Sequence, residues 1–190
     1  MKTPVLSLLL AAASLLTSCD NLNKPKTLNE PSEATADTAV VYRNDFDLRN
    51  VQLTEVKLPE VKTPGTTVRG DANYQVYSLD ETVLFDLDKA AIRPGAAKAL
   101  DEILASINQR YTGKDIRVMG FTDSTASASY NMDLAKQRAE AVKSYLTKSG
   151  KIPADKVTTE SFGQRQPVAT NATPEGRQKN RRVEIVVRTK

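Results

Sequence analysis

The sequence predicts an α+β fold in which two helices cover a small sheet, and three observations support this. Over residues 71–190, short apolar runs typical of strands alternate with two longer segments whose apolar residues recur every three or four positions. Pro and Gly stand where these segments start or stop. The resulting order, β-α-β-α-β-β, favours two layers, with helices packed on a sheet.

Residues 74–121 are expected to form three strands and one helix. Strands are expected at 74–77 and 82–85, where aromatic and β-branched residues cluster. Pro94 then opens a helix whose apolar residues continue at helical spacing to Ile107. A further strand is expected at 116–121, directly before Thr122 and Asp123.

The second half of the domain repeats the alternation of helix and strand. A helix is expected over 131–148, because Gly150 and Pro153 follow it, and a strand over 157–162. Thr173 as N-cap and Pro174 at the first helical position predict a short helical turn. Alternating apolar residues at 183, 185 and 187 then predict a final strand.

The N-terminus has the features of an exported lipoprotein. Residues 1–18 combine Lys2 with an apolar run of about twelve residues, shorter than the ~20 that span a bilayer, and are typical of a signal peptide. Leu16-Thr17-Ser18-Cys19 resembles the bacterial lipobox, which implies cleavage before Cys19 and lipid on its sulfur. Attached acyl chains would anchor the protein in a membrane. We expect the anchor to lie in the outer membrane, with the protein facing the periplasm. Because Asp20 follows Cys19, the inner membrane remains an alternative.

Residues 20–70 are expected to be a flexible linker to the domain. They are rich in Thr, Pro, Asn, Glu and Lys and show no sustained helical period. Some extended character is expected near Pro59 and Pro64, where Val and Leu recur. The linker could also hold a binding segment for a periplasmic protein.

Composition argues against catalysis and against nucleic acid. The chain has no His and one Cys, so the commonest general base is missing and no zinc or cofactor site is expected. Of the formal net charge of +4, residues 165–190 contribute seven basic and two acidic side chains. The positive charge is therefore local, and no aromatic ladder alternates with it as in single-strand binders.

One charged residue falls on the apolar face of the second helix. At 100° per residue, Arg138 lies in the middle of the arc formed by Leu134, Ala135, Ala141, Val142 and Tyr145. A buried guanidinium is costly unless an anion pairs with it. Asp123, at the end of the strand before this helix, is the best candidate in the sequence.

Two interpretations of this pair remain open from the pattern. Asp123 and Arg138 could form a structural ion pair. Alternatively they could lie side by side and bind a zwitterion, with the carboxylate taking an ammonium group and the guanidinium a carboxylate. Helical periodicity does not distinguish them.

Three blocks of residues resemble the peptidoglycan-associating domains of the OmpA-like family. The central block follows the pattern T-D-x-x-G-x-x-x-Y-N-x-x-L-S-x-x-R-A, with Ala126 and Ala135 in place of its Gly and Ser. If the Gly position requires a positive φ, Ala126 costs about 1 kcal/mol. The matching residues are Phe85-Asp86-Leu87-Asp88-Lys89, Ile92 and Pro94; Thr122-Asp123, Tyr130-Asn131, Leu134 and Arg138-Ala139; and Gly163, Pro167, Asn171, Thr173, Glu175-Gly176-Arg177 and Asn180 to Ile185.

The resemblance implies a two-layer sandwich with a mixed sheet and helices on one face. It also implies noncovalent binding of peptidoglycan through the diaminopimelate of its stem peptide. Asp123 would hold the ligand ammonium and Arg138 its carboxylate, Thr122 and Asn131 would add hydrogen bonds, and Arg181 would line the site from the last strand.

The function expected is that of a lipid-anchored module, not an enzyme, that tethers a membrane to the cell wall. The alternatives are a signalling or scaffold lipoprotein that captures a periplasmic partner, and an enzyme acting on the wall. The acidic residues form no recognisable catalytic pair, so the enzyme is disfavoured. Whether the domain dimerises is left open.

Overall fold

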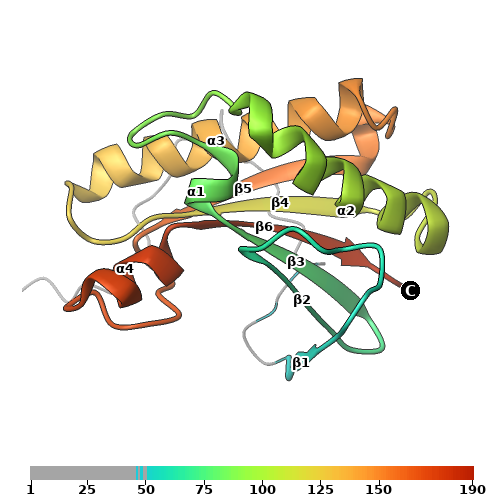
Figure 1. Cartoon of the computed structure of the whole chain (residues 1–190), viewed down its shortest axis with the longest axis horizontal. Coiled ribbons are helices and arrows are strands. Elements are labelled where there is room, and N and C mark those ends of the chain that lie inside the picture. The colour runs from blue at the N-terminus through green and yellow to red at the C-terminus, as the bar shows by residue number, and fades with distance from the viewer. Residues whose placement is uncertain (1–45, 47, 49–50) are drawn as a thin grey trace, which may run out of the picture. The chain divides into compact units, whose positions relative to one another are not determined.

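Six strands form one mixed sheet in the computed structural model, which describes residues 46, 48 and 51–190. The strand order is β1-β2-β3-β6-β4-β5 (Figure 1). Only β4 and β5 are parallel, because the long helix α3 connects them as a crossover. The strands are β1 (Thr54–Glu55), β2 (Thr66–Gly70), β3 (Tyr74–Asp80), β4 (Ile116–Phe121), β5 (Val157–Gly163) and β6 (Arg182–Arg188).

Two long helices lie side by side over one face of the sheet, whereas α4 lies apart from them near one end of β6 (Figure 1). Ser127 caps α3 by accepting from the Tyr130 N–H, and Thr173 caps α4 by accepting from Gly176, as expected for Thr173. The helices are α1 (Glu81–Leu84), α2 (Ala97–Arg110), α3 (Ala128–Lys148) and α4 (Pro174–Asn180), with single 3₁₀ turns at Pro94–Ala96 and Ala154–Lys156.

The two-layer α+β fold with a mixed sheet is confirmed. Its main core lies between the sheet and α2 and α3, where alternate residues of β6, Val183, Ile185 and Val187, meet apolar residues of both helices. Helix α3 approaches β4 closely, because a Cβ on Gly120 would lie 2.1 Å from the carbonyl oxygen of Ala135. This contact fixes the height of α3 above the sheet.

The opposite face of the sheet carries a smaller apolar cluster. Val76, Met119, Phe121 and Val186 contribute to it from β3, β4 and β6, and Phe46 packs on them from the N-terminal side. The Phe121 ring stacks on the ring of Phe162, with centroids 5.2 Å apart. The helix-free face is therefore also partly buried.

The expected strand at 82–85 is wrong, because this stretch belongs to the single helical turn α1 and the residue after it. The Phe85 N–H donates to the Glu81 carbonyl at 2.8 Å, and Leu84 and Phe85 are both buried. A short apolar run has no periodicity that separates strand from buried helix. The correction matters because it places Glu81 at a helix start, directly after β3.

The end of the expected linker also differs from the structure. Strand β2 pairs with β3 along its whole length, and Val68 is buried in the main core. The Glu102 carboxylate accepts from the backbone N–H groups of Lys62 and Thr63, which fastens the preceding segment to α2. These partners are distant in sequence, so local composition could not predict them. The signal peptide, Cys19 and the linker residues 20–45, 47, 49 and 50 fall outside the described residues.

None of the helices in the described part of the chain has the length and hydrophobicity needed to cross a membrane.

Candidate ligand-binding site

Four charged side chains from separate parts of the fold form an alternating chain of ion pairs. Arg181 Nη1 lies 2.7 Å from Asp123 Oδ2, and Arg181 Nε lies 2.6 Å from Glu81 Oε2. The second oxygen of Glu81 accepts from Arg138 Nη2. The order along the chain is therefore Asp123, Arg181, Glu81, Arg138, with two negative and two positive groups. We call these four residues the charged cluster.

Asp123 is held at the point where β4 ends. The pairing of β4 with β5 shifts register at a bulge between Gly120 and Phe121. Directly after β4, the Thr122 N–H donates to the Gly163 carbonyl at 2.9 Å. The Asp123 Oδ1 atom accepts from the backbone N–H of Thr125 at 3.0 Å and from its hydroxyl at 2.6 Å. This turn aims the other carboxylate oxygen at Arg181.

The pKa of Asp123 is lowered from its ordinary value. Burial raises this pKa, but the hydrogen bonds from Thr125 and the ion pair with Arg181 outweigh burial. The pKa of Arg181 is raised although burial lowers it, because Asp123 and Glu81 both favour the charged guanidinium. Both groups therefore keep their charges at neutral pH.

Thr122 and Asn131 support the loop after β4. The Thr122 hydroxyl donates to the Asp123 carbonyl at 2.9 Å, and Asn131 Nδ2 donates to the same carbonyl at 3.0 Å. Asn131 Nδ2 also lies 3.2 Å from the Ala126 carbonyl and 2.8 Å from Gln164 Oε1. Both side chains are buried, and they fix the backbone that carries Asp123.

Arg138 projects from α3 into the interior and is only 2% exposed. Its Nε donates to the Lys89 carbonyl at 3.0 Å, and the guanidinium lies over the Phe85 ring at 5.2 Å from its centroid. The expectation that an anion accompanies this arginine is confirmed. The anion is Glu81, however, and among the described residues no salt bridge joins Arg138 to Asp123.

Arg181 is the more exposed of the two cluster arginines, at 24% of its side chain. It lies at the C-cap of α4, one residue before β6, and not on the last strand as expected. Its Nη2 donates to Gln178 Oε1. The cluster thus joins the end of β4, the start of α1, the middle of α3 and the junction between α4 and β6.

The sequence did not identify Glu81 or Gln178 as site residues. Glu81 directly precedes the stretch mistaken for a strand, and only its position between two arginines reveals it. Gln178 lies on α4, and its buried Nε2 has no hydrogen-bond partner among the described residues. A buried amide donor without a partner costs free energy, and nothing in the local sequence marks it.

The backbone conformation is informative at Asp88 and at Ala126, the position where the family usually has Gly. Asp88 has φ of 54° and the Lys89 N–H donates to the Asp86 carbonyl, so Asp86 and Asp88 belong to a turn. In the described part of the chain, the non-glycine residues with positive φ are Asp88 and Lys151. Ala126 is thus accommodated without the strain that a left-handed conformation would impose.

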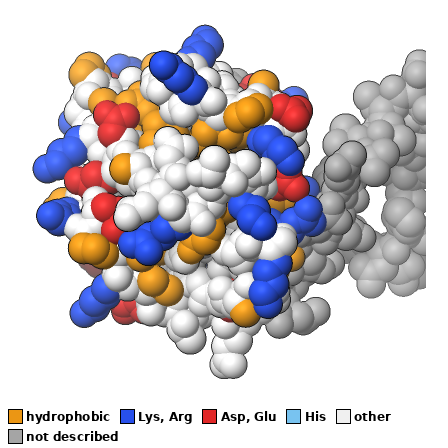
Figure 2. Space-filling model, turned by 90° about the vertical axis from the view of Figure 1, so that its right-hand side faces the viewer, with side chains coloured by type: hydrophobic (Ala, Val, Ile, Leu, Met, Phe, Trp, Pro, Cys, Tyr) orange, Lys and Arg blue, Asp and Glu red, His pale blue; other side chains and the backbone are white. Residues whose placement is uncertain are grey.

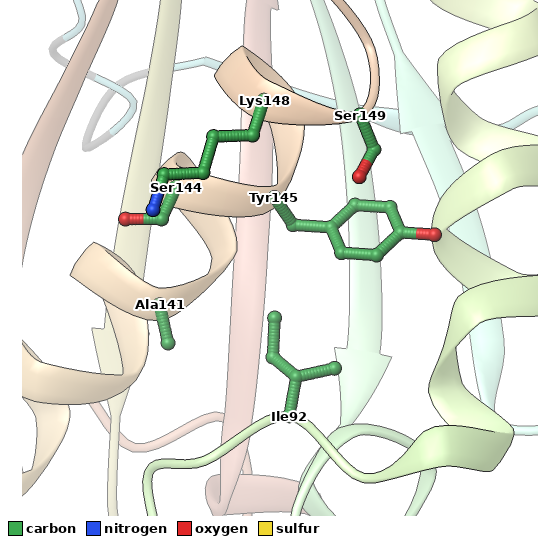
Figure 3. A pocket seen from close by; sticks show the side chains of 6 residues that line it. All are labelled: Ile92, Ala141, Ser144, Tyr145, Lys148 and Ser149. Atoms are coloured by element: carbon green, nitrogen blue, oxygen red, sulfur yellow. The ribbon is translucent and has the colours of Figure 1, made fainter.

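Two other surface features are distinct from the charged cluster. A shallow groove of about 330 Å³ lies at the end of α3. The Tyr145 ring lies above Ile92 in it (Figure 3). Its lining residues are Ile92, Ala141, Ser144, Tyr145, Lys148 and Ser149. On the face shown in Figure 2, Lys and Arg side chains are spread among acidic and hydrophobic ones and do not form one basic surface.

Comparison with known proteins gives consistent matches. The OmpA family model matches residues 84–181, 98 of the 190 residues. The probable lipoprotein YiaD of Escherichia coli is 34% identical over 134 residues, which are 70% of this chain and 60% of that protein. The peptidoglycan-binding protein ArfA of Mycobacterium tuberculosis is 38% identical over 105 residues, 55% of this chain and 32% of that protein.

A solved structure extends the match to three dimensions. The cell wall anchor of the T6SS from Pseudomonas aeruginosa superposes with a TM-score of 0.60 at 29% identity, over 66% of this chain and 89% of that one. The chain spans no more than 60% of the length of the two curated relatives. The matched family is non-enzymatic, in agreement with the sequence analysis.

Proposed function

Because the chain belongs to the OmpA family, we propose that its domain binds peptidoglycan noncovalently, through the diaminopimelate of the stem peptide. The observation that carries the proposal is the charged cluster, which places anions and cations within one connected group. Two similar proteins, the peptidoglycan-binding protein ArfA and the cell wall anchor of the T6SS, support the same ligand class.

The cluster has the chemistry that a free amino-acid end requires. The end of diaminopimelate bears an ammonium and a carboxylate on one carbon, so a site for it needs an acceptor and a cation close together. Asp123 can accept from the ammonium, and Arg138 can donate two parallel hydrogen bonds to the carboxylate. Thr122 and Asn131 position Asp123 through its backbone, so we assign them an indirect part in binding.

Gln178 gives independent support for a ligand at this place. Its Oε1 accepts from Arg181, so its unpartnered Nε2 lies beside the charged cluster. A ligand oxygen bound next to Arg181 would give this buried donor an acceptor. The cluster therefore has spare hydrogen-bonding capacity for an acceptor.

Co-sedimentation with purified sacculi tests the proposal. Asp123→Ala and Arg138→Ala are expected to abolish sedimentation with the wall, while circular dichroism shows that the domain still folds. Tyr145→Phe, in the groove of Figure 3, is the control and should sediment like the wild type. Normal sedimentation of both cluster variants would contradict the proposal.

We further propose that Cys19 carries lipid and anchors the protein in the outer membrane, with the domain in the periplasm. The lipobox-like segment before Cys19 supports this, as does the similarity to a probable lipoprotein. Cys19→Ala should move the protein from the membrane fraction to the soluble fraction. Recovery of the wild type in the inner-membrane fraction of a density gradient would contradict the outer-membrane assignment.

A further inference from the structure

The two oxygens of the Glu81 carboxylate are divided between two arginines. Oε1 accepts from Arg138 and Oε2 accepts from Arg181, and the residue is only 5% exposed. Its backbone N–H also donates to the Arg181 carbonyl at 3.0 Å. Glu81 is therefore fixed by backbone and side chain in one position, between the two cations proposed to serve the ligand.

This position coincides with the one a ligand carboxylate needs. The Arg138 guanidinium is 2% exposed, and its Nε and Nη2 atoms already donate to the Lys89 carbonyl and to Glu81. Both bidentate edges of a guanidinium include Nη2, so a ligand carboxylate that binds Arg138 in this way has to share that atom with Glu81 or displace it. Two carboxylates beside one guanidinium also repel each other in a poorly solvated site.

Glu81 lies outside the segment that defines the family match. That segment begins at residue 84, whereas Asp123, Arg138 and Arg181 all fall inside it. Glu81 itself lies three residues before this segment, at the start of α1.

We propose that Glu81 is a specificity-determining residue whose carboxylate occupies the ligand-carboxylate position on Arg138. The inference rests on the proposed function, since it concerns the same site. While Glu81 is present, a ligand carboxylate has to displace it from Arg138, so the free acid gains less affinity over its amide than it would at an unoccupied guanidinium. Without the Glu81 charge, Arg138 is left unpaired and the ligand carboxylate becomes its best partner.

The test compares two forms of one probe on the full domain. The probes are a stem tripeptide with the free diaminopimelate carboxylate and the same peptide with that carboxylate amidated, titrated by calorimetry. Glu81→Gln is expected to bind the free acid about tenfold more tightly than the wild type does, as a new charge-assisted contact would give. Its affinity for the amidated peptide should stay within about threefold of the wild type.

Glu184→Gln is a matched control. Glu184 is also 5% exposed and also bridges two arginines, Arg69 and Arg182, on the opposite face of the sheet. This variant should bind both probes as the wild type does. A gain that appears in both variants would overturn the inference, because it would reflect a general effect of lost charge.

The wild type gives a measurement that does not depend on a variant folding. It should favour the free acid over the amidated peptide by less than about tenfold, because the ligand carboxylate has to displace Glu81 from Arg138. A preference for the free acid of more than about tenfold, or weaker binding of that acid by a folded Glu81→Gln, would overturn the inference and leave the proposed function standing. Absence of binding to both probes and to sacculi would instead overturn the proposed function, and this inference with it.

Discussion

Each face of the sheet carries a buried glutamate that bridges two arginines. The two groups of charges differ in the parts of the fold that they connect. Glu184 accepts from Arg69 at 3.1 Å and from Arg182 at 2.9 Å, and all three residues lie on strands of the sheet. Glu81 instead joins Arg138 of α3 to Arg181, and through it to the loop after β4.

The surroundings of the two clusters explain the difference. Arg182 lies over the Phe121 ring, 3.7 Å from its centroid, and donates to the Gln166 carbonyl, so its guanidinium is enclosed by the fold. Arg181 stays 24% exposed and lies beside Gln178, whose Nε2 has no hydrogen-bond partner among the described residues. A buried ion pair is therefore weak evidence of a binding site, and its connection to exposed loops with unused donors is stronger evidence.

The largest effect is expected from breaking the ion pairs of Glu184 with Arg69 and Arg182, for which we propose no part in ligand binding. Glu184→Gln leaves Arg182 buried beside an uncharged amide and should lower the free energy of unfolding by about 3 kcal/mol. Denaturant unfolding followed by circular dichroism measures this loss. A variant as stable as the wild type would show that the ion pairs of Glu184 with Arg69 and Arg182 contribute little to the free energy of unfolding.

The next effect concerns binding at the other cluster. Asp123→Asn should weaken binding of the free stem peptide about 30-fold, or about 2 kcal/mol, because the amide offers no charge to an ammonium. Asp115→Asn is the matched control, since Asp115 pairs with Arg188 at the opposite end of the β4 and β6 pair. Equal losses of peptide affinity in both variants would show that the Asp123 end of the β4 and β6 pair is no more important for binding than the Asp115 end.

Acid should reveal the ion pair of Asp123 in the stability of the free protein. Its pKa is below the ordinary value of 3.8 in the folded state, so the carboxylate stabilises the fold above that value and loses this contribution as the pH falls through the folded-state pKa. Between about pH 5 and pH 2, the wild type should lose more stability than Asp123→Asn. Parallel pH profiles of the two proteins would contradict this assignment.

The smallest effect is expected at an ion pair near the surface, which tests whether burial separates the buried ion pairs of Glu81 and Glu184 from ordinary surface contacts. Arg110 Nε lies 2.9 Å from Glu60 Oε1, and this bond to Arg110 lowers the pKa of Glu60 to about 2 despite the opposing effect of burial. Because Arg110 is exposed and Glu60 is only partly buried, Glu60→Gln should cost only about 0.5 kcal/mol. A loss of stability as large as that of Glu184→Gln would contradict the distinction between buried and surface ion pairs.

The sequence predicted those parts of the fold that depend on local signals. Helix periodicity located α2 and α3, and the misplaced charge of Arg138 correctly required an anion. It did not identify the anion, because Glu81 is 57 residues away and reaches Arg138 only after β3 and α1 are in place. The same limit explains β2, whose partners on β3 could not be predicted from a segment rich in Pro and Thr.

The geometry assigns the predicted site residues to different contacts from those expected. Asp123 and Arg138 were expected as neighbours, and the structure joins them through Arg181 and Glu81. Thr122 and Asn131 were expected to contact the ligand, and in the structure their side chains hold the Asp123 backbone. Side-chain hydrogen bonds within a loop depend on atomic positions that spacing does not specify.

The most direct measurement is an NMR titration of the arginine Nε–H signals with the diaminopimelate stem tripeptide. If the charged cluster binds the ligand, the signals of Arg138 and Arg181 shift in proportion to saturation, while those of Arg69 and Arg182 stay in place. Shifts at Arg69 and Arg182, or no shift at Arg138 and Arg181 with saturating peptide, would contradict the assignment of the site.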